Sequence, residues 1–274
     1  MFEKEKFCKL ALRNEKGEQF TMLDSHCHLN DSQYQGQVDE IVNNFLCAGV
    51  EKVICVGCDE KSNEKAKEIA GDYEQVFYTV GIHPDDCETY NEQKLERYLK
   101  QRDNKLVAIG EIGLDYFHNS DNKETQKRVF ISQIELAKKY KLPIVVHCRD
   151  AYGDTLDILK SCADFSLGVV LHCFSGSLEF ANEIIKLGGK ISFTGSVTFK
   201  NAHNLHRVAQ SIPLDSFFVE TDSPYLTPEP NRGKRNEPKN VKDVIKFIAN
   251  LRNTTFAEIE TQTDKNAKKF FHLN

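Results

Sequence analysis

The sequence predicts an α/β fold that consists of a TIM (β/α)8 barrel in a single domain. Short apolar runs recur at intervals of roughly 20–40 residues, and charged, helix-like stretches separate them, which is the pattern of parallel βα units. The runs are apolar throughout rather than alternating, as expected for strands that are buried on both faces. A chain of 274 residues with 40% hydrophobic content is long enough for one such barrel.

Eight runs are expected to form the barrel strands. In chain order they are MLDSH (22–26), KVICVG (52–57), VFYTVG (76–81), LVAIG (106–110), PIVVH (143–147), GVVLH (168–172), GKISF (189–193) and FFVET (217–221). The stretches between the runs have helical periodicity. In 123–141, for example, Phe130, Ile134 and Ala137 follow one another at i, i+4 and i+7, and Pro143 then begins the next strand.

Residues 1–21 precede the first barrel strand and are expected to form an N-terminal extension, so that the barrel spans 22–274. The segments KLALRN and QFTML, joined by a polar turn with Gly17, would suit a β-hairpin. A frayed terminus ahead of an internal start at Met22 fits the sequence equally well. No low-complexity tract or composition break indicates a further domain boundary.

The composition limits the classes of function. The formal net charge of −5 gives no positive field over the whole protein, so nucleic-acid binding would depend on a local basic patch or on metal. The charged N-terminus and the lack of an apolar run of about 18 residues predict a soluble, cytoplasmic protein without a membrane partner. The nine scattered cysteines favour reduced thiols. The C-x-x-C pair Cys55 and Cys58 ends a strand rather than opening a helix, which disfavours a redox function.

A histidine pair lies at the end of the first predicted strand. His26 and His28 are two residues apart, so on a strand both imidazoles project from one face and can bind one metal ion. The pair alone is weak evidence, because a chain of this composition contains roughly 0.3 such pairs by chance.

Four further ligand-type side chains change this estimate, because the fourth, fifth, sixth and eighth runs end at Glu111, His147, His172 and Asp222. The carboxyl ends of barrel strands meet on one face, where the active site of such a barrel is built. Four imidazoles and two carboxylates can hold two divalent metal ions roughly 3.5–4 Å apart if Glu111 bridges them. Glu111 and Asp222 are therefore the predicted catalytic residues, and Asp222 would orient or deprotonate a metal-activated water.

Several longer strings make the chain resemble the TatD family of metal-dependent deoxyribonucleases, within the amidohydrolase superfamily. The resemblance extends from about residue 22 to the C-terminus. The matching strings are LDSHCHL (23–29), GIHP (81–84), GEIGLDY (110–116), PIVVHCRDA (143–151), HCFSG (172–176), ETDSPYLTPEP (220–230) and RGKRNEP (232–238). It implies hydrolysis of DNA phosphodiester bonds, with 3′ to 5′ exonuclease action on single strands or 3′ ends.

The resemblance also implies an assignment of the metal ligands. His26, His28 and Asp222 would hold the first ion, His147 and His172 the second, and Glu111 both. The chain departs from the family at two places, since the family often has a second histidine where this chain has Asp85, and the N-terminal extension is unusual. The first departure bears on substrate contacts rather than on the metal ligands.

Basic side chains close to the strand ends are candidates for binding phosphate. Arg149 and Arg232 lie inside family strings, and His83 follows the third strand, where it could contact a phosphate or a water or have a structural role only. Lys234 and Arg235 are equally well explained as exposed side chains of a solvated loop without a phosphate contact. The other histidines are expected at the surface or in packing, and Cys27, Cys148 and Cys173 are expected in the barrel wall.

Two other classes of function remain open on the sequence. The same barrel and metal pattern serves amidohydrolases that act on small substrates, although several of those use a modified lysine where this chain has Glu111. A metal-binding or nucleic-acid-binding scaffold without turnover is the second alternative. The ligand types would accept magnesium, manganese or zinc, and no segment indicates an obligate protein partner.

Overall fold

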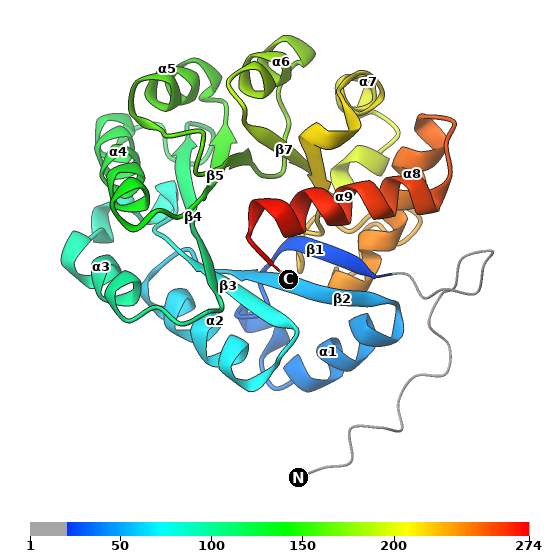
Figure 1. The fold of residues 1–274 in the computed structure, drawn as a ribbon, viewed down its shortest axis with the longest axis horizontal. Coiled ribbons are helices and arrows are strands. Elements are labelled where there is room, and N and C mark those ends of the chain that lie inside the picture. Colours follow the sequence, from blue (N-terminus) through cyan, green and yellow to red (C-terminus); the bar gives the residue numbers. More distant parts are fainter. Residues whose placement is uncertain (1–20, 274) are drawn as a thin grey trace.

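A computed structural model describes residues 21–273, and it shows the predicted barrel (Figure 1). Within these residues one sheet contains eight parallel strands in sequence order, each paired with the next. The strands are β1 (Met22–Cys27), β2 (Val50–Val56), β3 (Val76–Val80), β4 (Leu106–Asp115), β5 (Ile144–Arg149), β6 (Val169–Leu171), β7 (Lys190–Phe193) and β8 (Phe217–Val219). The predicted TIM barrel is confirmed. The predicted extension lies almost wholly outside the described residues.

Helices alternate with the strands and surround them (Figure 1). The α-helices are α1 (Val38–Cys47), α2 (Glu60–Asp72), α3 (Glu92–Lys100), α4 (Lys123–Tyr140), α5 (Tyr152–Cys162), α6 (Leu178–Lys186), α7 (His203–Ser211), α8 (Val241–Leu251) and α9 (Phe256–Phe270). Five short 3-10 helices lie in the described loops: η1 (Ser32–Tyr34), η2 (Pro84–Thr89), η3 (Gly195–Thr198), η4 (Leu214–Ser216) and η5 (Pro238–Asn240). The helix expected at 123–141 is thus confirmed as α4. Among residues 21–273, no helix combines the length and apolar character needed to span a membrane.

The two ends of the barrel differ in character. Helix α9 crosses the end at which the strands begin (Figure 1). There Phe270 and Phe271 pack on Phe218 of β8 and join a buried apolar cluster with residues near the strand starts, such as Leu23 and Val145. Burial of this apolar surface seals that end against water. The polar side chains of the barrel interior are therefore left to the opposite end.

Hydrogen bonds close the barrel between β1 and β8. Asp24 on β1 accepts from the backbone N–H of Thr221 at 2.8 Å and from its hydroxyl at 2.5 Å. Cys27 and Ser223 form a parallel bridge, and the N–H of Asp222 donates to the carbonyl of His26 at 2.9 Å. The segment after β8 is thereby fixed to the strand that carries the histidine pair.

Strand β4 differs from its predicted extent, since it continues five residues beyond Gly110 and reaches Asp115. The extra residues pair with β5 up to Arg149, and the register shifts between Ile109 and Ile112. The backbones approach so closely there that a Cβ on Gly113 would lie 2.0 Å from the His147 carbonyl oxygen. Glu111 therefore lies within a strand, at the irregularity, rather than after its end as expected.

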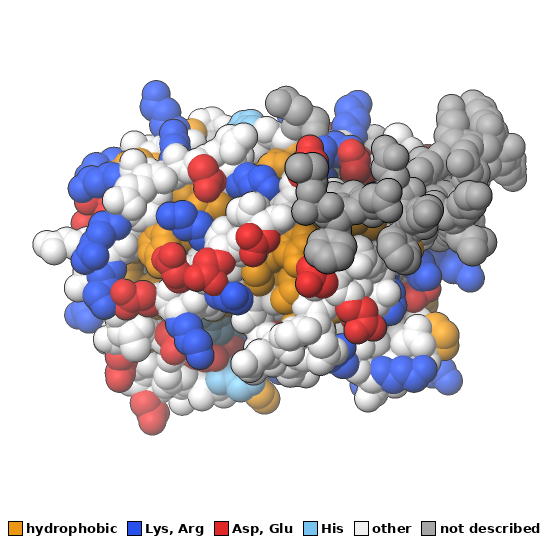
Figure 2. Space-filling view, turned by 90° about the horizontal axis from the view of Figure 1, so that it is seen from below, with side chains coloured by type: hydrophobic (Ala, Val, Ile, Leu, Met, Phe, Trp, Pro, Cys, Tyr) orange, Lys and Arg blue, Asp and Glu red, His pale blue; other side chains and the backbone are white. Residues whose placement is uncertain are grey.

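Charged groups of both signs are mixed over the face of the molecule shown in Figure 2. This distribution agrees with the near balance of 36 Lys and Arg against 41 Asp and Glu. Electrostatic attraction of a polyanion must therefore be local to a site.

The buried carboxyl of Asp264 on α9 should make the free energy of unfolding depend on pH. Burial raises the pKa of this carboxyl to about 6, although Lys268 lies 2.8 Å from Oδ2. Because the folded chain then binds the proton more tightly than the unfolded chain, this group's contribution is full below about pH 4 and is lost as pH rises through 6. Between pH 4 and 7, the unfolding free energy of the variant Asp264→Asn should fall by about 2 kcal/mol less than that of the wild type.

Urea unfolding of both proteins at several pH values measures this difference. Lys268 keeps its second partner in the variant, the carboxylate of Glu51 at 3.0 Å. Parallel pH dependences of the two proteins would contradict the prediction.

Candidate metal centre

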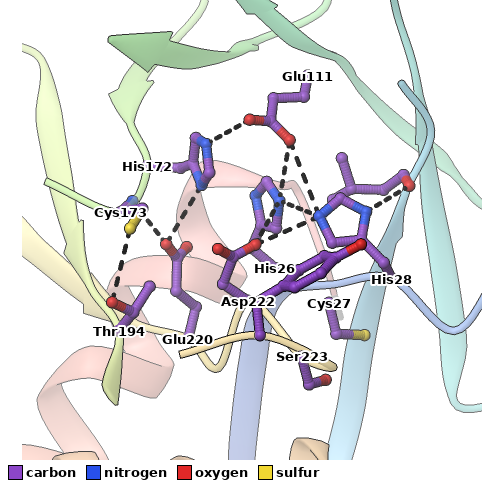
Figure 3. Close-up of polar contacts among 12 residues, drawn as sticks. His26, Cys27, His28, Glu111, His172, Cys173, Thr194, Glu220, Asp222 and Ser223 are labelled. Atoms are coloured by element: carbon purple, nitrogen blue, oxygen red, sulfur yellow. Dashed lines mark hydrogen bonds and ion pairs between the residues drawn. The ribbon is translucent and has the colours of Figure 1, made fainter. Parts of the chain in front are cut away.

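The six predicted ligand side chains converge at the end of the barrel opposite α9. Figure 3 shows His26, His28, Glu111, His172 and Asp222 there. His26 and His147 lie on β1 and β5, Glu111 lies within β4, and His28, His172 and Asp222 follow β1, β6 and β8. His26, Glu111 and His172 are buried, and the other three are partly exposed. Strands far apart in the sequence thus bring imidazoles and carboxylates to one place.

The first cluster contains His26, His28, Glu111 and Asp222. The two Nε2 atoms lie 3.2 Å apart. Glu111 Oε2 lies 3.4 Å from His26 Nε2 and 3.9 Å from His28 Nε2. Asp222 Oδ1 lies 3.6 and 3.3 Å from the same two nitrogens. Donor atoms about 3.4 Å apart suit a tetrahedral ion with bonds of about 2.1 Å, so this set fits a divalent cation.

The second cluster uses the other oxygen of the same glutamate. Glu111 Oε1 lies 2.8 Å from His147 Nδ1 and 2.6 Å from His172 Nε2, and these two nitrogens are 3.3 Å apart. His83 brings its Nε2 to 3.4 Å from the same oxygen. His83, Glu111 and His147 also form a set that could hold a metal ion. Glu111 therefore presents one oxygen to each cluster, as a bridging ligand would.

The charges in the centre suit cation binding. Although burial opposes ionisation, the imidazoles of His172 and His83 and the hydrogen bond from His147 hold the pKa of Glu111 well below its usual value. The pKa of Asp222 is also lowered against burial, chiefly by its contact with His28. Burial and the nearby His172 lower the pKa of His26. Against burial, the nearby carboxylates raise the pKa of His28, His147 and His172. Anionic carboxylates and neutral imidazoles are the forms that bind a metal, so an ion would displace the protons of these three histidines.

Two carboxylates that sequence reasoning missed contact two of the candidate ligand histidines. Asp115 Oδ2 lies 3.0 Å from His147 Nε2, on the far side of the ring from Glu111. Glu220 Oε1 lies 3.5 Å from His172 Nδ1 and accepts from the backbone N–H of Cys173 at 2.7 Å (Figure 3). Such contacts fix the orientation of a metal-binding imidazole and raise its basicity. Both residues lie inside the strings GEIGLDY and ETDSP, and that position was the available signal.

Two further residues lie closer to the centre than expected. Cys58 Sγ is 3.5 Å from Glu111 Oε2 and 3.9 Å from His28 Nδ1. His118, expected at the surface or in packing, is half exposed but places Nδ1 2.9 Å from Asp115 Oδ2. Asp85 forms with Asp115 and His118 another set close enough to hold an ion. Cys27 is buried in the barrel wall and donates its thiol to the carbonyl of Ile54 at 3.4 Å.

The predicted phosphate-binding side chains have aromatic neighbours. The guanidinium of Arg149, two residues beyond His147, lies 4.3 Å from the ring centre of Phe117. Arg232, in the loop after β8, stacks at 4.0 Å on Phe199. Arg235 donates to the carbonyl of Gln33 at 2.6 Å, so it ties the loop to the chain after β1.

The variant Asp115→Ala should weaken metal binding at the second cluster. His147 loses the contact that orients its ring, and loss of such a partner lowers metal affinity or activity about 10- to 100-fold. Titration of the metal-free protein with a single cation measures the effect. His118→Ala is the matched control, because it removes the other imidazole on the same carboxylate. Equal losses in the two variants would show that Asp115 does not act through His147.

Comparison with known proteins agrees with this geometry. The family profile described as "TatD related DNase" matches residues 23–272. The chain is 42% identical over 255 residues to "Uncharacterized metal-dependent hydrolase YabD" of Bacillus subtilis (strain 168), which covers 92% of this chain and all of that protein. It is 34% identical over 259 residues to "3'-5' ssDNA/RNA exonuclease TatD" of Cronobacter sakazakii, covering 92% and 98%.

The fold has close counterparts among solved structures. The crystal structure of YJJV, a TatD homologue from Escherichia coli K12, superposes with a TM-score of 0.88 at 30% identity, and the match covers 92% of this chain and 98% of that one. A TatD family hydrolase from Entamoeba histolytica gives a TM-score of 0.84 at 25% identity, covering 93% and 99%. The chain is therefore a metal-dependent hydrolase and belongs to the TatD family.

Proposed function

We propose that the protein hydrolyses phosphodiester bonds in DNA and removes nucleotides one at a time from the 3′ end. The observation that carries this proposal is the placement of Glu111, whose two oxygens face two separate clusters of imidazoles. Paired sites of this kind suit in-line displacement at phosphorus. The name of the Cronobacter relative supports nucleic acid as substrate and the 3′ to 5′ direction.

The proposed ligands are divided between two divalent cations. His26, His28 and Asp222 would hold the first, His147 and His172 the second, and Glu111 both. His83 lies near enough to join the second set. When bound, such ions lower the pKa of a water and polarise the phosphoryl oxygen, and magnesium, manganese and zinc are all compatible with the donors.

The chain itself supplies positioning and proton transfer. Asp222 is ionised and partly exposed, so its carboxylate can orient the attacking water and accept its proton. Arg149 and Arg232 are the proposed phosphate contacts, since a guanidinium binds phosphate oxygens in pairs. If His83 does not bind a metal ion, it would contact the substrate phosphate instead.

A hydrolase of small, non-nucleic-acid substrates is the competing function. The crystal structure of guanine deaminase from C. acetobutylicum shares the fold at a TM-score of 0.60, but at 13% identity the likeness extends to the fold alone. Nothing in the metal centre favours an amide or amine substrate over a phosphodiester. The competing function is therefore treated as an outcome of the experiment below.

Hydrolysis of an end-labelled single-stranded DNA and of a simple phosphodiester tests the proposal. Each substrate is incubated after chelation and after return of one metal at a time. Stepwise shortening from the 3′ end that requires metal supports the exonuclease function and identifies the working cation. If the metal-loaded protein cleaves neither substrate, the phosphodiesterase proposal is wrong and a non-phosphate substrate becomes the better hypothesis.

A further inference from the structure

Two aromatic side chains stand out on the surface. Among residues 21–273, the exposed large hydrophobic side chains are Phe117, which is 59% exposed, and Tyr225, which is 48% exposed. Burial of such a side chain would gain about 1.5–3 kcal/mol. A single exposed aromatic is unremarkable in a soluble protein. These two, however, both lie beside the metal centre.

Phe117 lies next to the second cluster. It follows Asp115, the carboxylate that holds His147, and its backbone N–H donates to Asp115 Oδ1 at 2.9 Å. The Arg149 guanidinium lies 4.3 Å from the ring centre, and the His118 ring meets it edge-on at 4.8 Å. The ring is thus fixed on one side by neighbours, while its exposure leaves room for a flat ligand.

Tyr225 lies next to the first cluster. It follows Asp222 by three residues, and its ring centre is 6.2 Å from that of His28, at an angle of 66°. The hydroxyl donates to Asp31 Oδ2 at 2.7 Å, which holds the ring in position. Each cluster of the centre therefore has one exposed aromatic ring beside it.

We propose that Phe117, backed by Arg149, is a stacking platform for an unpaired nucleobase beside the scissile phosphodiester, and that Tyr225 is a second platform next to the first cluster. This inference rests on the proposed function and specifies its substrate as single-stranded nucleic acid. Proteins bind single strands by stacking bases on aromatic rings, with cationic groups on the backbone phosphates. Paired bases in a duplex keep their faces stacked on each other, so duplex DNA offers the rings no free base.

A role in base stacking gives a reason for exposed aromatic side chains at the polar end of the barrel. With a net charge of −5, the protein cannot hold a nucleic acid by its overall field. Base stacking contributes affinity that does not depend on charge and is tolerant of sequence. Arg149 would serve twice, as the cation over the Phe117 ring and as a donor to the adjoining phosphate.

Fluorescence anisotropy of the metal-loaded protein tests the platform. The probes are a labelled, phosphorothioate-linked oligothymidylate, which resists cleavage, and an abasic strand of the same length and charge. Phe117→Ala should weaken binding of the thymidylate strand about 5- to 150-fold, which corresponds to about 1–3 kcal/mol for one stacked base. Binding of the abasic strand should change much less.

Two variants control the measurement. Phe117→Tyr keeps an aromatic face and should bind like the wild type. Tyr98→Ala removes an aromatic side chain from α3, on the outside of the barrel, and should also bind like the wild type. Tyr225→Ala should likewise weaken binding of the thymidylate strand much more than binding of the abasic strand. Tyr225→Phe keeps the aromatic ring and should bind the thymidylate strand like the wild type.

The outcomes separate the platform from the proposed reaction. The platform is overturned if the wild type does not prefer the thymidylate strand, or if Phe117→Ala weakens both strands equally. Stacking that depends on Phe117, in a protein that cleaves no ordinary phosphodiester DNA, would keep the platform and overturn the nuclease. Cleavage of DNA that is insensitive to Phe117→Ala and Tyr225→Ala would keep the nuclease and overturn the platform.

Discussion

Glu111→Ala should abolish phosphodiester hydrolysis, with kcat/KM lowered by at least about 10³-fold, because several kcal/mol of metal-derived stabilisation are lost. The two oxygens of this side chain face different clusters, so one substitution removes a ligand from both proposed ions. Steady-state hydrolysis of end-labelled DNA measures the activity. Mass spectrometry of the dialysed protein measures the metal content, which should fall at both sites.

The control for Glu111→Ala is Cys58→Ser, which alters the thiol 3.5 Å from Glu111 Oε2 and leaves the carboxylate in place. Thermal unfolding shows whether each variant is folded. Near-native activity in a folded Glu111→Ala protein would rule out a mechanism with two bridged ions. Loss of only one equivalent of metal would show that Glu111 does not bridge.

Asp222→Asn should lower kcat about 10²- to 10⁴-fold, the range expected for loss of a general base. Asparagine keeps the size of the side chain but is neutral and cannot accept the proton of the attacking water. The backbone should tolerate the change, because Asp222 has a φ of 55°, a left-handed conformation that asparagine adopts readily. Single-turnover cleavage at saturating metal isolates the chemical step from weakened metal binding.

Asp150→Asn is the matched control for Asp222→Asn. Asp150 follows β5 at the same end of the barrel, has a φ of 54° and is exposed. The same change of charge and backbone preference is thus made outside the two clusters, and activity should remain close to that of the wild type. If the two variants lose activity to the same degree, the effect is one of local charge and Asp222 is not the base.

The barrel strands were predictable because a strand that is buried on both faces needs an uninterrupted run of apolar residues, and such a run can be recognised in the sequence. Each predicted run contains or overlaps an observed strand. The extra length of β4 was not predictable in this way. Residues beyond Gly110 stay in the strand because glycines allow the β5 backbone to approach, and that requirement depends on a neighbour 34 residues away in the chain.

The ligand-type residues were found because each lies at or near a strand end, a position that sequence reveals. The supporting residues were not, because their roles depend on contacts across strands. Asp115 acts on His147 from the neighbouring strand, and Cys58 approaches Glu111 from the loop after β2. His118 follows Asp115 by only three residues, and the turn after β4 folds its ring back onto that carboxylate.

The seam between β1 and β8 determines when the first cluster can form during protein synthesis. His26 and His28 emerge from the ribosome early, whereas Asp222 follows the last strand, and the N–H of Asp222 reaches the carbonyl of His26 only when the barrel closes. A nascent chain that ends before the last strand lacks Asp222, the fourth side chain of this cluster. The proposed nuclease therefore cannot become active before β8 and Asp222 have been made and the barrel has closed.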